Sequence, residues 1–134
     1  MTDDRPTHAV KAVIRNQEGK ILFLQRTPDP TKKVIPNWDF PGGIVENGEE
    51  DKIALRREIQ EELQVDSRVG DEIGKWTFFR PFDQKTVEVT NYSVEILSAD
   101  FTLSDEHIDS KWVTFEEARK LPVKDASLFD ALGI

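Results

Sequence analysis

Residues 43–65 read GIVENGEEDKIALRREIQEELQV. The Asn47-Gly48 pair is typical of a turn, because glycine reaches backbone angles closed to other residues, and the spacing becomes helical from about Glu50. Three aliphatic side chains then recur every four residues and form one apolar stripe: Leu55, Ile59 and Leu63. Three carboxylates share a neighbouring face: Glu58, Glu61 and Glu62. The stretch therefore predicts an amphipathic helix that carries a cluster of acids beside its apolar stripe.

The acid cluster has two interpretations. One neighbouring cation, Arg57, cannot balance three carboxylates, and the remaining charge suits a hard divalent cation such as Mg2+, which binds through carboxylates, waters and substrate phosphates. The alternative is a solvated helix face on which Arg57 pairs with Glu61. The short Arg-Glu-x-x-Glu-Glu segment by itself favours the solvated face. The longer pattern around it is therefore needed to choose between the two interpretations.

The longer pattern resembles the signature of the Nudix hydrolases. That signature is Gly, five residues, Glu, seven residues, Arg-Glu, an aliphatic residue, any residue, Glu-Glu, any residue, Gly and an aliphatic residue. The matching positions are in register: Gly43, Glu49, Arg57, Glu58, Ile59, Glu61, Glu62 and Val65. Gln64 departs from it, since the family usually has glycine just past the helix. A left-handed residue there costs a non-glycine about 1 kcal/mol, so the departure concerns the helix end rather than the carboxylates.

The resemblance implies the Nudix fold, an α/β architecture in which a mixed β-sheet is sandwiched between α-helices (α/β/α). It implies metal-dependent hydrolysis of the pyrophosphate linkage of a nucleoside diphosphate bonded to another group. The cofactor would be Mg2+ or Mn2+, with these ligands: Glu58, Glu61, Glu62 and the carbonyl of Gly42. Arg57, reaching back to Glu49, would orient the helix against the preceding loop.

The general base is the least determined part of the implied site. It is either Glu58 or Glu106, an acid in a later loop, where Nudix-like chains often place a residue that joins the metal site or acts as base. The alternative for Glu106 is a plain loop carboxylate. The adjacent His107 has the ordinary pKa of a base, but a lone histidine is more often structural.

Five residues are candidates for contact with substrate: Arg26, Trp38, Phe40, Gly43 and Arg80. The family often places an arginine where Arg26 ends a strand, which implies a phosphate contact; a solubilising surface arginine is the alternative. Trp38 is expected in core or loop packing, with stacking on a nucleobase as the functional alternative. Arg80, with Phe79 and Phe82, is a candidate for the wall of a substrate pocket, although most aromatics in that segment are expected in the core.

The rest of the chain predicts a small mixed fold. Apolar or alternating segments predict these strands: 8–14, 20–26, 38–40, 75–80, 87–97 and 108–113. The first two are expected to pair as a hairpin, and 75–80 with 87–97 as another, while 66–74 is a connection or an edge strand. The loop 27–36 is expected to flank the site. Thr114 and Glu117 predict a capping box that begins a short helix, and 126–132 predicts a last helix.

Composition bounds the class of protein. At 134 residues the chain fits a single domain, 1–134, whose residues 1–7 are expected to fray. The absence of cysteine removes disulfides, thiolate metal sites and cysteine nucleophiles. No apolar run approaches the ~20 residues that span a bilayer, so we expect a cytoplasmic protein with no membrane partner. A net charge of −8 has the wrong sign for binding a nucleic-acid polymer, so the expected partner is a small-molecule nucleotide. A homodimer is compatible with the sequence.

The substrate is less determined than the reaction. The minimal length and the Trp-x-Phe-Pro-Gly-Gly segment resemble the housecleaning members that cleave (deoxy)nucleoside triphosphates. Pro81, close to where ADP-ribose-cleaving members often carry a proline, makes an ADP-ribose or nucleotide-sugar pyrophosphatase the alternative. A nucleotide-binding sensor module is the non-enzyme alternative, but such domains tend to lose the glutamates that are present here. The isomerase branch of the fold would use a catalytic cysteine, which this chain lacks.

Overall fold

The computed structural model describes residues 7–32 and 36–132. The predicted fraying of residues 1–6 lies outside the described residues, as do residues 33–35 of the predicted loop 27–36. Thr7, the last residue of the segment predicted to fray, is the first residue of strand β1. Within the described ranges, no helix has both the length and the apolar character needed to cross a membrane.

A four-stranded mixed sheet has the order β4-β1-β6-β5. Strand β1 (Thr7–Ile14) runs parallel to β6 (Lys85–Ile96) and antiparallel to β4 (Gly42–Ile44). Strand β5 (Ser67–Arg80) pairs antiparallel with β6, which confirms the predicted pairing of 75–80 with 87–97. The pairing extends back through two irregularities to Ser67, so most of segment 66–74 is part of an edge strand rather than a connection.

The predicted hairpin of 8–14 with 20–26 is wrong. Strand β2 (Ile21–Arg26) belongs to a second, three-stranded sheet of order β3-β2-β7, and an isolated bridge between Arg15 and Ile21 is its link to β1. It pairs antiparallel with β3 (Trp38–Asp39) and β7 (His107–Val113). Both β1 and β2 contain consecutive buried residues, which is typical of central strands covered on two faces. Because such strands accept partners on either side, proximity in the sequence did not decide their pairing.

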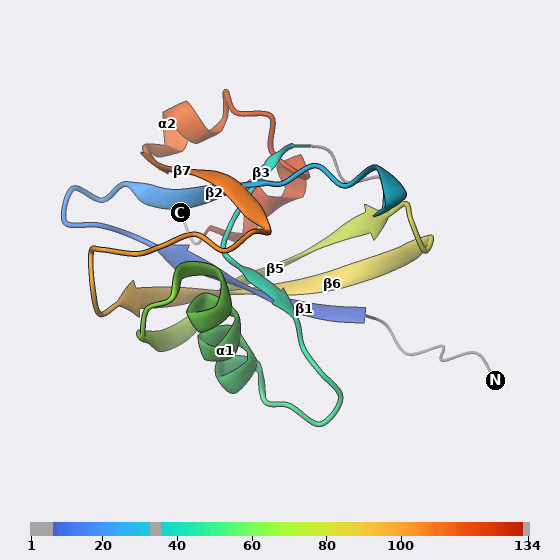
Figure 1. Cartoon of the computed structure of the whole chain (residues 1–134), viewed down its shortest axis with the longest axis horizontal. Coiled ribbons are helices and arrows are strands. Elements are labelled where there is room, and N and C mark those ends of the chain that lie inside the picture. Colours follow the sequence, from blue (N-terminus) through green and yellow to red (C-terminus); the bar gives the residue numbers. More distant parts are fainter. Residues whose placement is uncertain (1–6, 33–35, 133–134) are drawn as a thin grey trace.

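The core lies in two parts on the two faces of β1. One part contains Val10, Ala12 and Ile14 and packs against the predicted apolar stripe of helix α1 (Asp51–Leu63). The other contains Ala9 and Val13 and packs against the C-terminal 3-10 helix η2 (Ala126–Ala131). This division follows from the alternation of side chains along a strand. Figure 1 shows α1 and α2 (Phe115–Ala118) on opposite sides of the strands.

The helix ends follow local chemistry. Thr114 and Glu117 form the predicted capping box of α2. Gln64 ends α1 in the left-handed region with φ of 57°, as expected for the position where the family usually has glycine. The last helix predicted for 126–132 is a 3-10 helix over 126–131, and another short 3-10 helix, η1 (Pro30–Lys32), lies in the loop after β2.

Candidate active site

The two glycines of β4 lie directly against the acidic face of α1. A Cβ on Gly42, whose φ is 140°, would overlap the backbone of Val10 and Lys11. A Cβ on Gly43 would lie 2.5 Å from the carboxyl carbon of Glu58. The N–H of Gly42 donates to Oε2 of Glu62 over 3.1 Å. The Pro-Gly-Gly segment therefore brings bare backbone against two carboxylates, and a side chain at Gly43 would displace the carboxylate of Glu58.

The three predicted carboxylates of α1 differ in exposure. Glu62 is 2% exposed, and burial raises its pKa to about 8 although Lys11 and the Gly42 N–H oppose that rise. Burial also raises the pKa of Glu58, against the opposing charge of Arg57. The side chain of Glu61 is 59% exposed. A buried and a half-buried acid whose pKa values are both raised by burial form a donor set that fits a divalent cation, because a cation favours their charged forms.

Arg57 joins the helix to the preceding loop, as predicted. Its Nε donates to Glu49 Oε2 over 2.8 Å and its Nη2 donates to Glu49 Oε1 over 2.9 Å. Its Nη1 donates to Glu58 Oε1 over 3.0 Å, and Glu61 lies farther away at 3.4 Å. The paired hydrogen bonds lower the pKa of Glu49 to about 2. Arg57 therefore fixes the position of the Glu58 carboxylate without itself facing the cavity described below.

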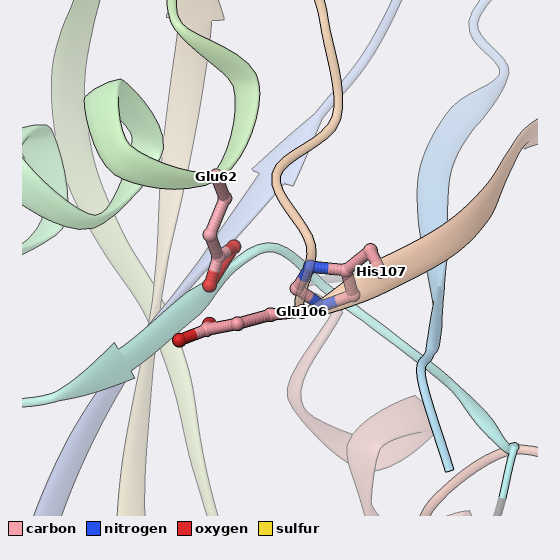
Figure 2. Close-up of side chains that lie close together, drawn as sticks. All are labelled: Glu62, Glu106 and His107. Atoms are coloured by element: carbon pink, nitrogen blue, oxygen red, sulfur yellow. The ribbon is translucent and has the colours of Figure 1, made fainter.

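Glu106 and His107 bring two further donors to Glu62. One ligand atom from each of these three residues lies within 4.8 Å of the others, and Figure 2 shows the three side chains converging from α1 and the start of β7. Glu106 is exposed, whereas His107 is 6% exposed, and burial, reinforced by Lys11 and Arg26, lowers its pKa to about 4. From the sequence, a structural role is the favoured interpretation of His107. Its place beside Glu106, in the loop already proposed for the site, was the signal that could have found it.

Backbone hydrogen bonds hold the loop of Glu106 against α1. The N–H groups of Thr102 and Ser104 donate to the carbonyls of Leu63 and Glu62, which the end of the helix leaves without partners. On the other side, the N–H of Thr27 donates to the carbonyl of Glu106 over 2.9 Å. The left-handed turn at Gln64 thus exposes carbonyls that dock a distant loop, which explains why Glu106 reaches Glu62.

A cavity of about 400 Å³ lies beside Gly42 and Gly43. Its wall combines cationic and aromatic side chains: Lys11, Arg26, Arg80, Lys124, Phe78, Phe79 and Phe82. Three predicted contact residues thus meet there, namely Arg26, Gly43 and Arg80. Phe79 is 59% exposed, and the guanidinium of Arg80 lies 4.9 Å from the ring centre of Phe82 while pairing with Asp83. The cavity is suited to an anion attached to a flat ring.

The structure buries Trp38 and Phe40, two of the five candidates for contact with substrate. Trp38 is 4% exposed and Phe40 is 1% exposed, and the ring of Phe40 packs 4.9 Å from that of Phe23. Neither side chain lines the cavity, because both point into the core between the sheets. The interpretation of Trp38 as a packing residue is therefore the one the structure supports, and the exposed aromatics of the site are Phe79 and Phe82.

A buried charge network that no sequence pattern indicated lies behind the cavity. Asp39 lies between two ammonium groups, 3.0 Å from Lys11 Nζ and 3.9 Å from Lys124 Nζ. Burial alone would raise the pKa of Asp39, but the two cations lower it below its ordinary value. Lys124 also lies 3.9 Å from the ring centre of Phe78, and burial lowers its pKa to about 8. One carboxylate against two ammonium groups leaves this wall with excess positive charge.

The fold and the site are typical of enzymes that hydrolyse acid anhydrides. A NUDIX domain model matches residues 5–132, and the chain therefore belongs to the Nudix family as a pyrophosphohydrolase. The CTP pyrophosphohydrolase of Escherichia coli (strain K12) is 29% identical over 119 residues, which cover 89% of this chain and 84% of that protein. The 8-oxo-dGTP diphosphatase of Proteus vulgaris is 36% identical over 67 residues, covering 49% and 57%.

The predicted α/β/α fold is confirmed by solved structures. The MutT protein from Methanosarcina mazei Go1 superposes with a TM-score of 0.82 at 30% identity, covering 96% of this chain and 92% of that one. The strands nevertheless divide into two sheets rather than the one sheet expected from the sequence.

Proposed function

We propose that the chain hydrolyses the pyrophosphate linkage of (deoxy)nucleoside triphosphates in a reaction that requires Mg2+ or Mn2+. The observation that carries the proposal is the position of Gly42 and Gly43 between the acids of α1 and the cationic, aromatic cavity. The names of the two relatives, a CTP pyrophosphohydrolase and an 8-oxo-dGTP diphosphatase, support this class of substrate.

The donors described above fit a divalent cation. Glu62, Glu106 and Glu58 would hold it together with the carbonyl of Gly42, and Glu61 would join from the solvent side. When bound, the cation neutralises phosphate oxygens and makes water a better nucleophile. Glu58 is the stronger candidate for the base that accepts the proton of water, because the hydrogen bond from Arg57 holds its carboxylate in a fixed position. Glu106 remains the alternative base.

The cavity wall would bind the rest of the nucleotide. Arg26 and Lys11 supply positive charge on the side of Gly42, where phosphate oxygens would lie. Phe79 and Phe82 offer exposed rings on which a nucleobase would stack. Because the chain carries a net charge of −8, this local positive charge is what would overcome repulsion of a polyphosphate.

The test is pyrophosphate or phosphate release from a panel of NTPs, oxidised dGTP, ADP-ribose, nucleotide sugars and dinucleoside polyphosphates. Each substrate is run with Mg2+, with Mn2+ and with EDTA. We expect turnover of nucleoside triphosphates that EDTA abolishes, and a loss of at least about 10²-fold in Glu58→Gln. Glu116→Gln, on the exposed side of α2, is the matched control and should keep full activity.

Two results of this substrate panel would each assign the chain a different function. Pro81 lines the cavity, which is the observation that favours ADP-ribose or a nucleotide sugar, and selective turnover of those compounds would assign the chain to that class. Saturable nucleotide binding without turnover of any compound would indicate the sensor module instead.

A further inference from the structure

His107 is a buried polar side chain that the proposed function leaves without a role. It is the first residue of β7, its side chain is 6% exposed, and its Nδ1 has no hydrogen-bond partner among the residues that the structure describes. Buried polar atoms of folded proteins are nearly always hydrogen-bonded or bound to an ion, and leaving one unpaired costs about 1–3 kcal/mol. The position of this ring therefore requires a chemical explanation.

The position of the ring relative to Glu62 and Glu106 suggests that explanation. Ligand atoms of the three residues lie within 4.8 Å of one another, and Figure 2 shows the imidazole edge turned towards the two carboxylates. Ligand atoms that are each about 2.1 Å from one octahedral cation are about 3.0 Å apart when adjacent and about 4.2 Å apart when opposite. The limit of 4.8 Å exceeds both separations by less than about 2 Å, so side-chain rotations, above all of exposed Glu106, would bring the three atoms onto one ion.

The backbone holds the ring at this place independently of any ion. The N–H of His107 donates to the carbonyl of Ser104 over 3.2 Å, and the N–H of Ser104 donates to the carbonyl of Glu62 over 3.0 Å. On the other side, Glu106 is bound through its carbonyl to Thr27 at the end of β2. The imidazole is thus attached to the same helix end that carries Glu62, which is the arrangement expected of a preorganised ligand.

We propose that an imidazole nitrogen of His107 is a direct ligand of the cation held by Glu62 and Glu106, so that the site has a mixed nitrogen and oxygen donor set. Mg2+ prefers oxygen ligands and octahedral geometry, whereas imidazole suits first-row transition ions such as Mn2+. His107 therefore biases the site towards Mn2+ over Mg2+. The inference rests on the proposed cation site but not on the proposed substrate or on hydrolysis.

The chain offers a clean test because it contains two histidines. His8 lies at the opposite end of α1, bound to Asp51 over 3.1 Å, and serves as the matched control. Electron spin echo envelope modulation of Mn2+ bound to the full chain, without nucleotide, detects a directly bound 14N nucleus. We expect that signal in the wild type and in His8→Gln, and its loss in His107→Gln. Wild-type spectra without nitrogen coupling would overturn the inference.

A labelling experiment avoids dependence on the folding of His107→Gln. In His8→Gln grown with 15N-histidine, His107 is the single labelled residue, so the 14N signal should be replaced by that of 15N. A 14N signal that survives this labelling would come from another nitrogen and would overturn the inference.

The metal preference gives a second readout. Titration of the folded variants should show the Kd for Mn2+ rising about ten-fold in His107→Gln while the Kd for Mg2+ changes less than two-fold. Equal weakening of both ions would contradict a nitrogen ligand. Wild-type Mn2+ spectra without nitrogen coupling, in a protein whose turnover is EDTA-sensitive, would refute this inference alone. Nitrogen-coupled Mn2+ in a protein that turns over no substrate would refute the proposed function alone.

Discussion

Gly43→Ala should remove activity while leaving the fold almost unchanged. The added Cβ would lie 2.5 Å from the carboxyl carbon of Glu58, and ordinary contact begins at 3.4 Å, so the carboxylate must retreat by about 0.9 Å. Such a movement would also strain the 3.0 Å bond from Arg57. Because a displacement of 1 Å in a reacting group can cost about 10²-fold, we expect a loss of that order in kcat.

The stability of this variant should change by less than about 1 kcal/mol. Gly43 does not have a positive φ, so alanine suits its backbone, and the atom it meets is the end of a side chain that can move. Gly48→Ala is the opposite control. A Cβ there meets no described atom within 4 Å, but φ is 82°, so alanine should cost about 1 kcal/mol of stability and no activity.

Pyrophosphate release and thermal unfolding measured on both variants separate the two effects. The same Gly43→Ala change is also made in the Glu58→Asp variant, whose carboxylate is one methylene farther from Gly43. The added methyl group should therefore lower kcat by a smaller factor in Glu58→Asp than in the wild type. Full activity of Gly43→Ala, or an equal loss on both backgrounds, would refute the account of Gly43 as space for Glu58.

Three further predictions concern Arg57, the cavity wall and the buried lysine. Arg57→Lys loses the paired bonds to Glu49, so activity and Mn2+ affinity should fall about 10–100-fold with little change in Tm, whereas equal activity would exclude a positioning role. Phe79→Ala removes an exposed ring from the cavity and should raise KM for a nucleoside triphosphate about ten-fold with kcat retained. An unchanged KM would show that the nucleobase does not stack on Phe79. Burial lowers the pKa of Lys124 in the folded protein to about 8, below the ordinary lysine value of 10.5, so the unfolded chain binds more protons between these values and stability should rise with pH across that window. Urea unfolding of Lys124→Met should lack this part of the pH dependence, which exposed Lys120→Met should keep; an identical slope in Lys124→Met would disprove the shift.

Local patterns predicted the parts of the chain whose partners lie nearby. The stripe on α1, the pairing of Arg57 with Glu49 and the capping box at Thr114 each depend on residues within one or two helical turns. The hairpin of β5 and β6 was also predictable, because a turn of a few residues joins the two strands and β5, at the edge of its sheet, pairs with β6 on one side. These contacts close short loops and cost little conformational entropy, so a short segment of the sequence is enough to predict them.

The burial of the aromatic residues could not be predicted from local patterns. Trp38 and Phe79 are both large, flat and adjacent to charged residues, yet Trp38 is in the core and Phe79 lines the cavity. Their exposure depends on which face of which sheet each strand presents to the rest of the molecule. No local pattern contains that information, because it is set by the packing of two sheets against each other.

The sequence by itself determined the family signature, the carboxylates of α1 and their link to the preceding loop. Only the tertiary structure decided that β1 and β2 belong to different sheets, that Asp39 lies between Lys11 and Lys124, and that His107 faces Glu62. The physical reason is that these contacts join residues far apart in the chain. They are fixed by how buried strands and helix ends satisfy their backbone hydrogen bonds and bury their apolar faces together.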